Sequence, residues 1–369
     1  MLRIELRASS VNRHSAMLYE PIKEILGRLC GAIAGVVRLG DRPADKKHEP
    51  ERPLLEITGD IFLSAARKLY DFHVDHDLTT ASYEYLDELI KSSEIKKALA
   101  QKGKSGWNDF TSVMKHVFSY EGFRDSKKLI LEDAEQGGKF FHWGKQDGDV
   151  GEWWGAWRFI KDSGIRYCPY CNADSVYSAS FLTEEDSDKQ KFIKSELDHF
   201  MPRSHYPFLA ISLYNLIPSC RRCNGGVKGA VDVDFESCLY PYRDSIHDAV
   251  KFDCDPSAFK SYHGDGCGEA LKIQERNGKG VQGKRALNFL STFHLREVYH
   301  ELFADEIIQE FRDVYEHSPL IARVLKADNP GITDKDIRRI LFHRSLERDD
   351  INRVRFGKAF LDLRERLPA

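Results

Sequence analysis

The chain has 369 residues, of which 41% are hydrophobic and 31% are charged, and its formal net charge is −3. This composition is typical of a soluble globular protein and excludes a chain that is disordered throughout. The slightly acidic balance excludes a dedicated basic nucleic-acid coat, so any contact with nucleic acid must come from a local patch or from a partner. The length predicts two or three domains.

Apolar stretches in the sequence are short. The N-terminal segment lacks the apolar core of a signal peptide, and the most apolar stretch, 29–39, is too short to span a bilayer and contains an arginine. We therefore expect a cytoplasmic protein that makes no contact with a membrane. In that compartment thiols stay reduced, so paired cysteines point to metal binding or catalysis rather than to disulfides.

The N-terminal part of the chain is predicted to be mostly helical from its apolar spacing. Charge and prolines mark one linker in it, and a Gly-rich polar stretch marks a loop before the central part. The predicted elements are a strand at 2–6, a helix at 19–29, a linker at 40–53, mostly helix at 54–135 and a loop at 136–150.

The C-terminal part has a polar, Gly-rich stretch over 253–283, followed by two helical segments over 284–317 and 334–366. We therefore divide the chain into three regions. They are a mostly helical N-terminal region of unknown role at 1–150, a central module at 151–245 and a mainly helical C-terminal region at 246–369.

Two Cys-x-x-Cys units stand in the central module, Cys168-Pro-Tyr-Cys171 and Cys220-Arg-Arg-Cys223. Two intervening residues let both sulfurs of a unit turn toward one point. Two such units supply four thiolates, which is a ligand set of tetrahedral structural zinc. The sequence therefore predicts one structural Zn²⁺ bound by Cys168, Cys171, Cys220 and Cys223.

The first of these units also allows a second interpretation, because Cys-Pro-Tyr-Cys is the tetrapeptide of glutaredoxin redox sites. Such a site requires a helix that begins at the cysteines and lowers the thiol pKa through its dipole. Here the residues that follow, 172–181, indicate a turn and a strand, and a redox site leaves the second pair unexplained. We therefore favour zinc over the redox interpretation.

The segment between the two cysteine pairs carries polar residues that suit a catalytic site. Asp198 and His199 end a strand-like run that Pro202 stops. Asn215 precedes a short second strand, and Asn224 follows the second cysteine pair. Two strands and a helix in this order would bring Asp198, His199 and Asn224 to one side of a small finger.

These motifs resemble the HNH endonucleases, the ββα-metal nuclease family, and especially the bacterial subgroup braced by two Cys-x-x-Cys units. The resemblance rests on the Asp-His pair, the Asn-Leu-Ile-Pro-Ser-Cys strand and the Cys-Asn ending with its later Lys-Gly. Tyr240-Pro241-Tyr242 and the segment 287–296 are also similar to features of longer anti-phage nucleases of the Septu type. Residues 1–150 carry no such resemblance.

The resemblance implies an α+β protein, a mostly helical chain with a central zinc-braced ββα-metal (HNH) nuclease module at 151–245. It implies an endonuclease that hydrolyses DNA phosphodiester bonds in bacterial defence against phage or plasmids, with RNA left open as a substrate. Some Septu-type nucleases work beside an ATPase, so the resemblance also raises an ATPase partner. Sequence specificity, the trigger of cleavage and the oligomeric state stay open.

The resemblance also assigns roles to single residues. His199 is the general base, because a neutral imidazole with a pKa near 6.5 accepts a proton from water. Asp198 and Asn224 hold one catalytic Mg²⁺ or Mn²⁺ through oxygen atoms, which hard cations prefer. Asn215 orients His199. Each of these residues taken alone would more often have a structural role. Only their combination with the spacing of the two cysteine pairs favours a catalytic site.

Three cations near the second cysteine pair complete this set. Lys228, with Arg221 or Arg222, would bind the phosphates that flank the cleaved bond. Two departures from the family pattern qualify the assignment. Asn224 stands where histidine is usual and is a weaker metal ligand, and Gly225-Gly226 weakens the start of the helix.

The alternative function is a catalytically inactive, zinc-stapled module that binds nucleic acid or a partner protein. The intact set of Asp198, His199 and Asn224 argues against an inactive site. Cleavage of a plasmid in the presence of Mg²⁺ or Mn²⁺ would separate the two functions.

Overall fold

The structure is a computed structural model that describes most of the chain. The described residues are 4–31, 36–37, 55–56, 60–101, 110–131, 141–183, 186–255, 270–276, 280–342 and 348–364. The chain divides into two compact units. Unit 1 comprises Met1–Glu5, Gly164–Tyr177 and Pro218–Ala369, and unit 2 comprises Leu6–Ser163 and Ser178–Ile217. Each unit is described by itself.

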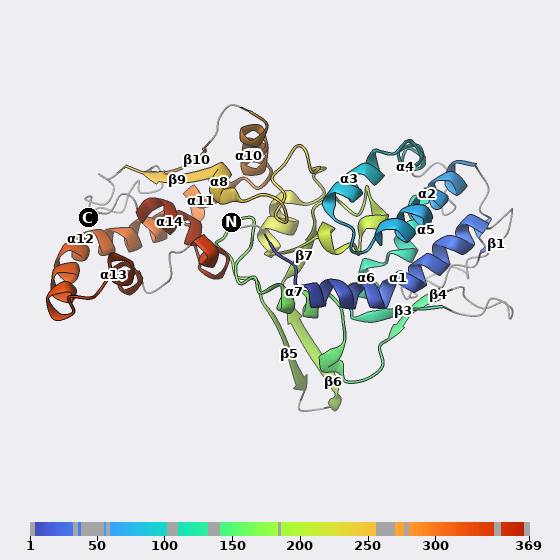
Figure 1. Cartoon of the computed structure of the whole chain (residues 1–369), viewed down its shortest axis with the longest axis horizontal. Helices are drawn as coiled ribbons and strands as arrows, with labels where there is room; N and C mark the ends of the chain where they lie inside the picture. Colours follow the sequence, from blue (N-terminus) through green and yellow to red (C-terminus); the bar gives the residue numbers. More distant parts are fainter. Residues whose placement is uncertain are drawn as a thin grey trace. The chain divides into compact units, whose positions relative to one another are not determined.

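The helices of unit 2 pack through apolar faces. They are α1 Ala8–Gly31, α2 Asp60–His76, α3 Tyr83–Lys91, α4 Ser93–Leu99, α5 Phe110–Val117, α6 Tyr120–Arg124 and α7 Ala156–Ser163. In α1 the residues Leu18, Ile22, Ile25 and Leu29 recur at helical spacing and are fully buried. This face explains why α1 lies along α2, as Figure 1 shows.

Short antiparallel hairpins accompany these helices. β1 Val36–Val37 pairs with β2 Leu55–Glu56, β3 Lys127–Leu131 with β4 Phe141–Lys145, and β5 Ser178–Thr183 with β6 Asp186–Lys194. The β5–β6 hairpin extends away from the helices of unit 2 (Figure 1). β7 Glu196–His199 forms a further two-stranded sheet with β8 Leu216–Ser219, and the division between the units falls within β8.

Unit 1 is built from C-terminal helices and one hairpin. Its helices are α8 Ile246–Ala249, α10 Val281–Thr292, α11 Leu295–Leu302, α12 Ala304–Asp328, α13 Asp334–Leu341 and α14 Gly357–Leu363. β9 Val250–Cys254 pairs antiparallel with β10 Leu271–Glu275. Val250, Phe252 and Cys254 alternate along β9 and are buried, which is the pattern of a strand with one face on the core.

A buried ion cluster joins α14 to β9. The Asp362 carboxylate accepts from the backbone N–H of Phe252 at 2.8 Å and from Arg276 at 2.7 Å, and it pairs with Lys358. Lys358 and Asp362 are 1% and 3% exposed. Burial lowers the pKa of Lys358 to about 8. A charge pair this deep needs all its partners, because removal of one would leave an uncompensated charge in the core.

The coarse fold expectation is confirmed, since the described residues are mostly helical with small sheets. The helix predicted at 19–29 is confirmed as part of α1. Two local predictions are wrong. Residues 4–7 form no strand, and in the described part of the chain the backbone hydrogen bond that links them to another segment runs from the Ile4 N–H to the Pro241 carbonyl.

Part of the loop predicted at 136–150 is strand β4. Pairing with β3 decides this, and Gly144 makes close pairing feasible because a Cβ there would lie 2.5 Å from the Ile130 side chain. The linker predicted at 40–53 lies outside the described residues. The three-region division at 150 and 245 stays a prediction, whereas the two units each combine segments distant in sequence. Within the described part of the chain, no helix is both long and apolar enough to cross a membrane.

A buried histidine ties α1 to the segment before β8. The Nε2 atom of His14 donates to the carbonyl of Ile211 at 2.8 Å, and its Nδ1 atom accepts from the indole N–H of Trp154 at 2.9 Å. Burial lowers the pKa of His14 to about 4. These two bonds require the neutral ring, so protonation must break one of them.

We therefore expect unit 2 to lose stability as the pH falls. An unfolded histidine titrates near 6.5, so between about pH 6.5 and pH 4 the unfolded state binds more protons than the folded state. The free energy of unfolding should fall by about 3 kcal/mol across this window. Urea unfolding followed at several pH values measures it. His14→Gln keeps one donor and one acceptor, and it should flatten the pH dependence; an unchanged slope in this variant contradicts the assignment.

Candidate metal centre and catalytic site

Four cysteine thiols of unit 1 converge on one point. The Sγ atoms of Cys168, Cys171, Cys220 and Cys223 all lie within 4.8 Å of one another, and all four residues are buried. The Sγ atoms of Cys171 and Cys220 are 3.9 Å apart, and all four cysteines are free thiols. Four sulfurs at about 2.3 Å from a tetrahedral zinc would be about 3.8 Å apart. The predicted convergence is confirmed, and the donor set fits Zn²⁺.

The environment of the thiols also favours a bound dication. Burial raises the pKa of the Cys168 thiol well above its ordinary value. Four buried thiolates without a cation would repel one another in a medium that solvates them poorly. A bound zinc ion reverses this balance, because it stabilises the thiolates directly. The residues that follow Cys168 form a turn and not a helix, which removes the structural basis of the glutaredoxin interpretation.

Arg222 and Tyr299 support the cysteine cluster. The Arg222 guanidinium bonds to the Asp174 carboxylate at 2.5 Å, lies 4.0 Å from the Sγ atom of Cys171, and sits 4.6 Å from the ring centroid of Phe303. The Tyr299 hydroxyl donates to the Cys171 carbonyl at 2.5 Å. Partners of this kind orient metal ligands and limit their motion.

Asn172 connects the first cysteine pair to the C-terminal segment. Its Nδ2 atom donates to the carbonyls of Ile351 and Val354 at 2.9 and 3.3 Å, and its Oδ1 atom accepts from the Lys358 N–H at 3.0 Å. Its own carbonyl accepts from the Phe356 N–H at 2.8 Å. Asn172 has a φ of 54°, a left-handed conformation that asparagine tolerates better than most residues. The sequence analysis did not identify Asn172 as a residue that supports the cluster. Its position directly after the Cys-x-x-Cys turn is the feature that could have indicated this role.

His199 stands at the end of β7 with its ring held by two neighbours. Its Nε2 atom lies 2.9 Å from the Ala210 carbonyl, and the Tyr120 ring contacts it edge-on, with 4.7 Å between centroids and 76° between planes. A carbonyl oxygen only accepts, so Nε2 carries a proton, and in the neutral form of the ring the lone pair is on Nδ1. The ring orientation is therefore determined before any substrate binds.

Asn215 is fully buried and staples the loop that follows His199. Its Nδ2 atom donates to the carbonyls of Met201 and Leu209 at 3.0 and 3.1 Å, and its Oδ1 atom accepts from the Met201 N–H at 2.8 Å. Its backbone carbonyl accepts from the Phe200 N–H at 2.9 Å. All three side-chain bonds go to loop backbone, so Asn215 would orient His199 through the loop and not through a bond to the imidazole.

The other predicted catalytic residues are divided between the units. Asp198 precedes His199 on β7 in unit 2 and is 2% exposed. Asn224 belongs to unit 1 and lies in a π-helical turn, Arg222–Lys228, where its carbonyl accepts from the Gly229 N–H at 2.7 Å. The expected meeting of Asp198 with Asn224 spans the two units and stays a prediction.

The three predicted phosphate-binding cations differ in their surroundings. Arg221 is exposed, the Arg222 guanidinium is engaged at the cysteine cluster, and Lys228 is 1% exposed. Buried and paired cations reach a phosphate only after rearrangement. A DNA contact by all three therefore stays a prediction, and Arg221 is the cation of this set that already faces solvent.

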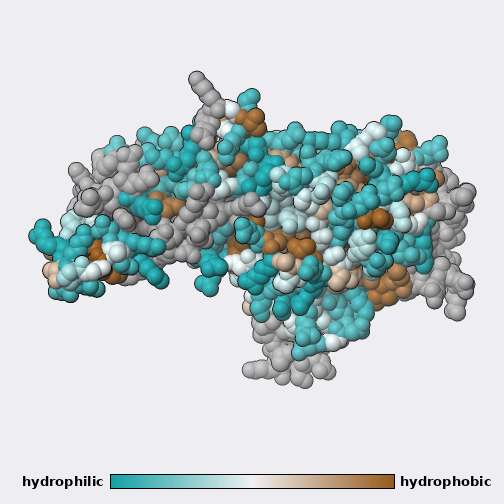
Figure 2. All heavy atoms as spheres, viewed as in Figure 1, coloured by the Kyte–Doolittle hydropathy of each residue, from teal (hydrophilic) through white to brown (hydrophobic). Residues whose placement is uncertain are grey.

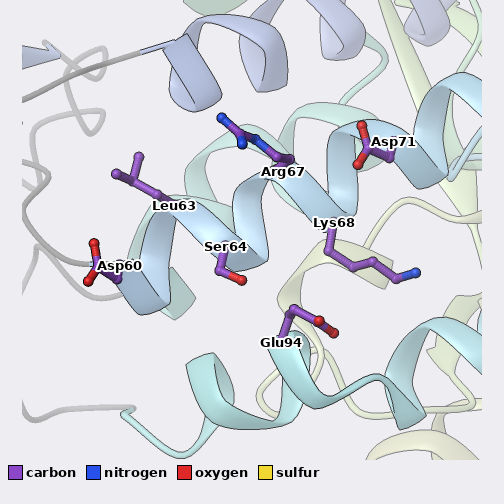
Figure 3. Close-up of a pocket in the computed structure, with 7 residues that line it drawn as sticks. All are labelled: Asp60, Leu63, Ser64, Arg67, Lys68, Asp71 and Glu94. Atoms are coloured by element: carbon purple, nitrogen blue, oxygen red, sulfur yellow. The ribbon is translucent and has the colours of Figure 1, made fainter.

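A groove elsewhere in unit 2 shares no residue with these sites. It has a volume of 460 Å³ and lies between α2 and α4, as Figure 3 shows. Its lining residues are Asp60, Leu63, Ser64, Arg67, Lys68, Asp71 and Glu94. Lys68 interacts electrostatically with Glu94, while Arg67 points away from Glu94. The surface over these helices is mainly hydrophilic (Figure 2), and three acidic and two basic side chains line the groove.

Comparisons with known proteins give partial matches. The chain is 33% identical to the Septu protein PtuB of Bacillus thuringiensis over 129 residues, which is 34% of this chain and 42% of that protein. It is 47% identical to protein ea31 of Escherichia phage lambda over 51 residues, 13% of this chain and 17% of that protein. The chain thus matches less than half the length of either relative. No protein-family profile and no solved structure matches the chain.

Proposed function

We propose that this protein is a metal-dependent endonuclease of the HNH type that hydrolyses DNA in defence against phage. The observation that carries the proposal is the fixed orientation of the His199 ring, whose Nε2 atom is bonded to the Ala210 carbonyl. His199 follows Asp198 on β7, and Asn215 fixes the loop after it by hydrogen bonds to the loop backbone. The zinc-type cysteine cluster supports it, because the two cysteine pairs flank this segment in sequence. The partial similarity to the Septu protein PtuB supports the defence role. The resemblance to Septu-type nucleases extends the proposal to an ATPase partner.

In the proposed reaction His199 acts on the attacking water. Its Nδ1 lone pair takes a proton from the water, and the resulting hydroxide attacks the phosphorus atom while the bond to the leaving oxygen breaks. The Ala210 carbonyl stabilises the imidazolium that forms, because it accepts from the Nε2–H throughout. Asn215 keeps the Ala210 carbonyl beside the His199 ring, because it bonds to the carbonyl of the adjacent Leu209.

A divalent cation completes the proposed site. Asp198 offers a buried carboxylate and Asn224 an amide oxygen, which are ligand types that Mg²⁺ and Mn²⁺ accept. When bound, the cation would supply charge neutralisation at the phosphate and at the leaving oxygen.

The test is plasmid cleavage by the purified protein. We expect nicked and linear DNA with Mg²⁺ or Mn²⁺ and none with a chelator of divalent metal, while structural zinc stays bound. A parallel RNA substrate decides between the two nucleic acids. DNA binding without cleavage at any divalent metal concentration, with the ATPase partner added, would instead favour the inactive binding module.

A further inference from the structure

The His199 side of the proposed site needs a cation of its own to hold the DNA phosphates. The three cations predicted to bind phosphate all lie in unit 1, and two of them are engaged or buried. A nuclease must hold the phosphates beside its general base, because a misplaced phosphate loses most of the benefit of that base. A suitable cation therefore has to be sought within unit 2.

Arg203 lies four residues after His199, at the first bend of the stapled loop. The Pro202 carbonyl accepts from the N–H groups of His205 and Tyr206 at 2.9 Å each, which places Arg203 in a tight turn. The side chain of Arg203 is 46% exposed, so the guanidinium faces solvent. Its loop is the same one that Asn215 holds in place.

Two residues of α6 hold this guanidinium. Arg203 donates to the Glu121 carboxylate at 2.6 Å and lies 5.0 Å from the ring centroid of Tyr120. The same Tyr120 ring contacts the His199 ring. One aromatic side chain therefore touches both the imidazole and the guanidinium and sets their separation.

The guanidinium keeps capacity for a ligand. Arginine has five N–H donors, and among the described residues Glu121 is its hydrogen-bond acceptor through one nitrogen. An exposed ion pair of this kind contributes little to stability, so a phosphate that accepts two hydrogen bonds can replace the Glu121 carboxylate. A further cation is near, since Arg124 and Arg203 both interact electrostatically with Tyr120.

We propose that Arg203, placed by Glu121 and Tyr120 of α6, binds a DNA backbone phosphate next to the bond that His199 acts on. This inference rests on the proposed nuclease function and deepens it. It also gives the N-terminal region a role, because that region supplies two residues that position the cation. Tyr120 is a positioning residue for both the guanidinium and the imidazole.

The experiment measures DNA affinity against salt concentration with a labelled duplex of mixed sequence, in a His199→Ala background that removes chemistry. Arg203→Gln should weaken binding about tenfold and reduce the slope of log K against log[salt] by about one. Arg203→Lys should restore the slope but only part of the affinity. Arg28→Gln is the matched control, because Arg28 is a partly exposed arginine of unit 2 bonded to Glu24 at 2.6 Å.

Wild-type affinity and slope in Arg203→Gln would overturn the inference, as would an equal loss in Arg28→Gln or a protein that binds no DNA. The readout separates the two proposals. If the protein with His199 never cleaves DNA but the Arg203 variants still change the slope, the nuclease proposal is refuted and the phosphate contact is kept.

A second pair of variants tests the positioning role of Tyr120 in the protein that retains His199. Tyr120→Phe should keep the pH profile of cleavage, whereas Tyr120→Leu should shift it.

Discussion

Replacing His199 with alanine is expected to lower plasmid cleavage by roughly 10²–10⁴-fold, which is the usual contribution of a positioned base. The fold should survive, because His199 makes its bond to a loop that Asn215 holds independently at Met201 and Leu209. DNA binding and zinc content should stay near the wild-type level, because the proposed role of His199 is to act on the attacking water and not on zinc or the phosphates.

Asp198→Ala should differ in kind from His199→Ala. It removes a proposed ligand of the catalytic cation, so higher Mg²⁺ or Mn²⁺ should relieve part of its defect, and no metal concentration should rescue His199→Ala. A nicking assay of both variants across a metal titration measures this. His317→Ala, at an exposed histidine of α12, is the control for histidine removal. Wild-type cleavage by His199→Ala would exclude the HNH assignment.

Removing zinc is expected to unfold unit 1. Structural zinc sites of this type bind with about 10–16 kcal/mol, which is comparable to the whole stability of a domain. Cys171 and Asn172 bond to Tyr299 and to the segment that leads into α14, so loss of the cluster should release these contacts together. Cys220→Ser should therefore give protein with little zinc that is insoluble or unfolded in this unit.

The control for this prediction is Cys238→Ser, which makes the same chemical change at a buried thiol outside the cluster. It should keep about one zinc per chain and remain soluble. Elemental analysis of both variants and of the wild type measures the zinc, and hydrogen exchange locates the loss in unit 1. Soluble, folded wild-type protein without zinc would contradict the assignment of the cluster.

Local sequence patterns determined the parts of this protein that depend on short-range chemistry. The helical spacing of Ile22, Ile25 and Leu29 predicted α1, since burial of one helical face requires that period. The spacing of two Cys-x-x-Cys units predicted the metal cluster for a similar reason, because few ligand geometries satisfy tetrahedral zinc. The Asp198-His199 pair was visible because two adjacent polar residues follow Leu197 at the end of a strand-like run, although the structure divides that run between β6 and β7.

Other features were decided by contacts between residues far apart in the chain. Strand β4 was missed because its stability comes from pairing with β3 and not from its own Gly-containing sequence. The burial of Lys228 and the pairing of Arg222 with Asp174 could not be read from a run of basic residues, since sequence alone does not reveal which cations the fold covers.

The same limit applies to the surroundings of His199. The sequence by itself determined that a histidine and an asparagine stand at the ends of two short strands. Only the tertiary structure decided that Tyr120 and Glu121, about 80 residues earlier, contact His199 and Arg203. Contacts at such separation depend on how the whole unit packs, because loop closure brings together residues whose contact cannot be predicted from the local sequence around either one.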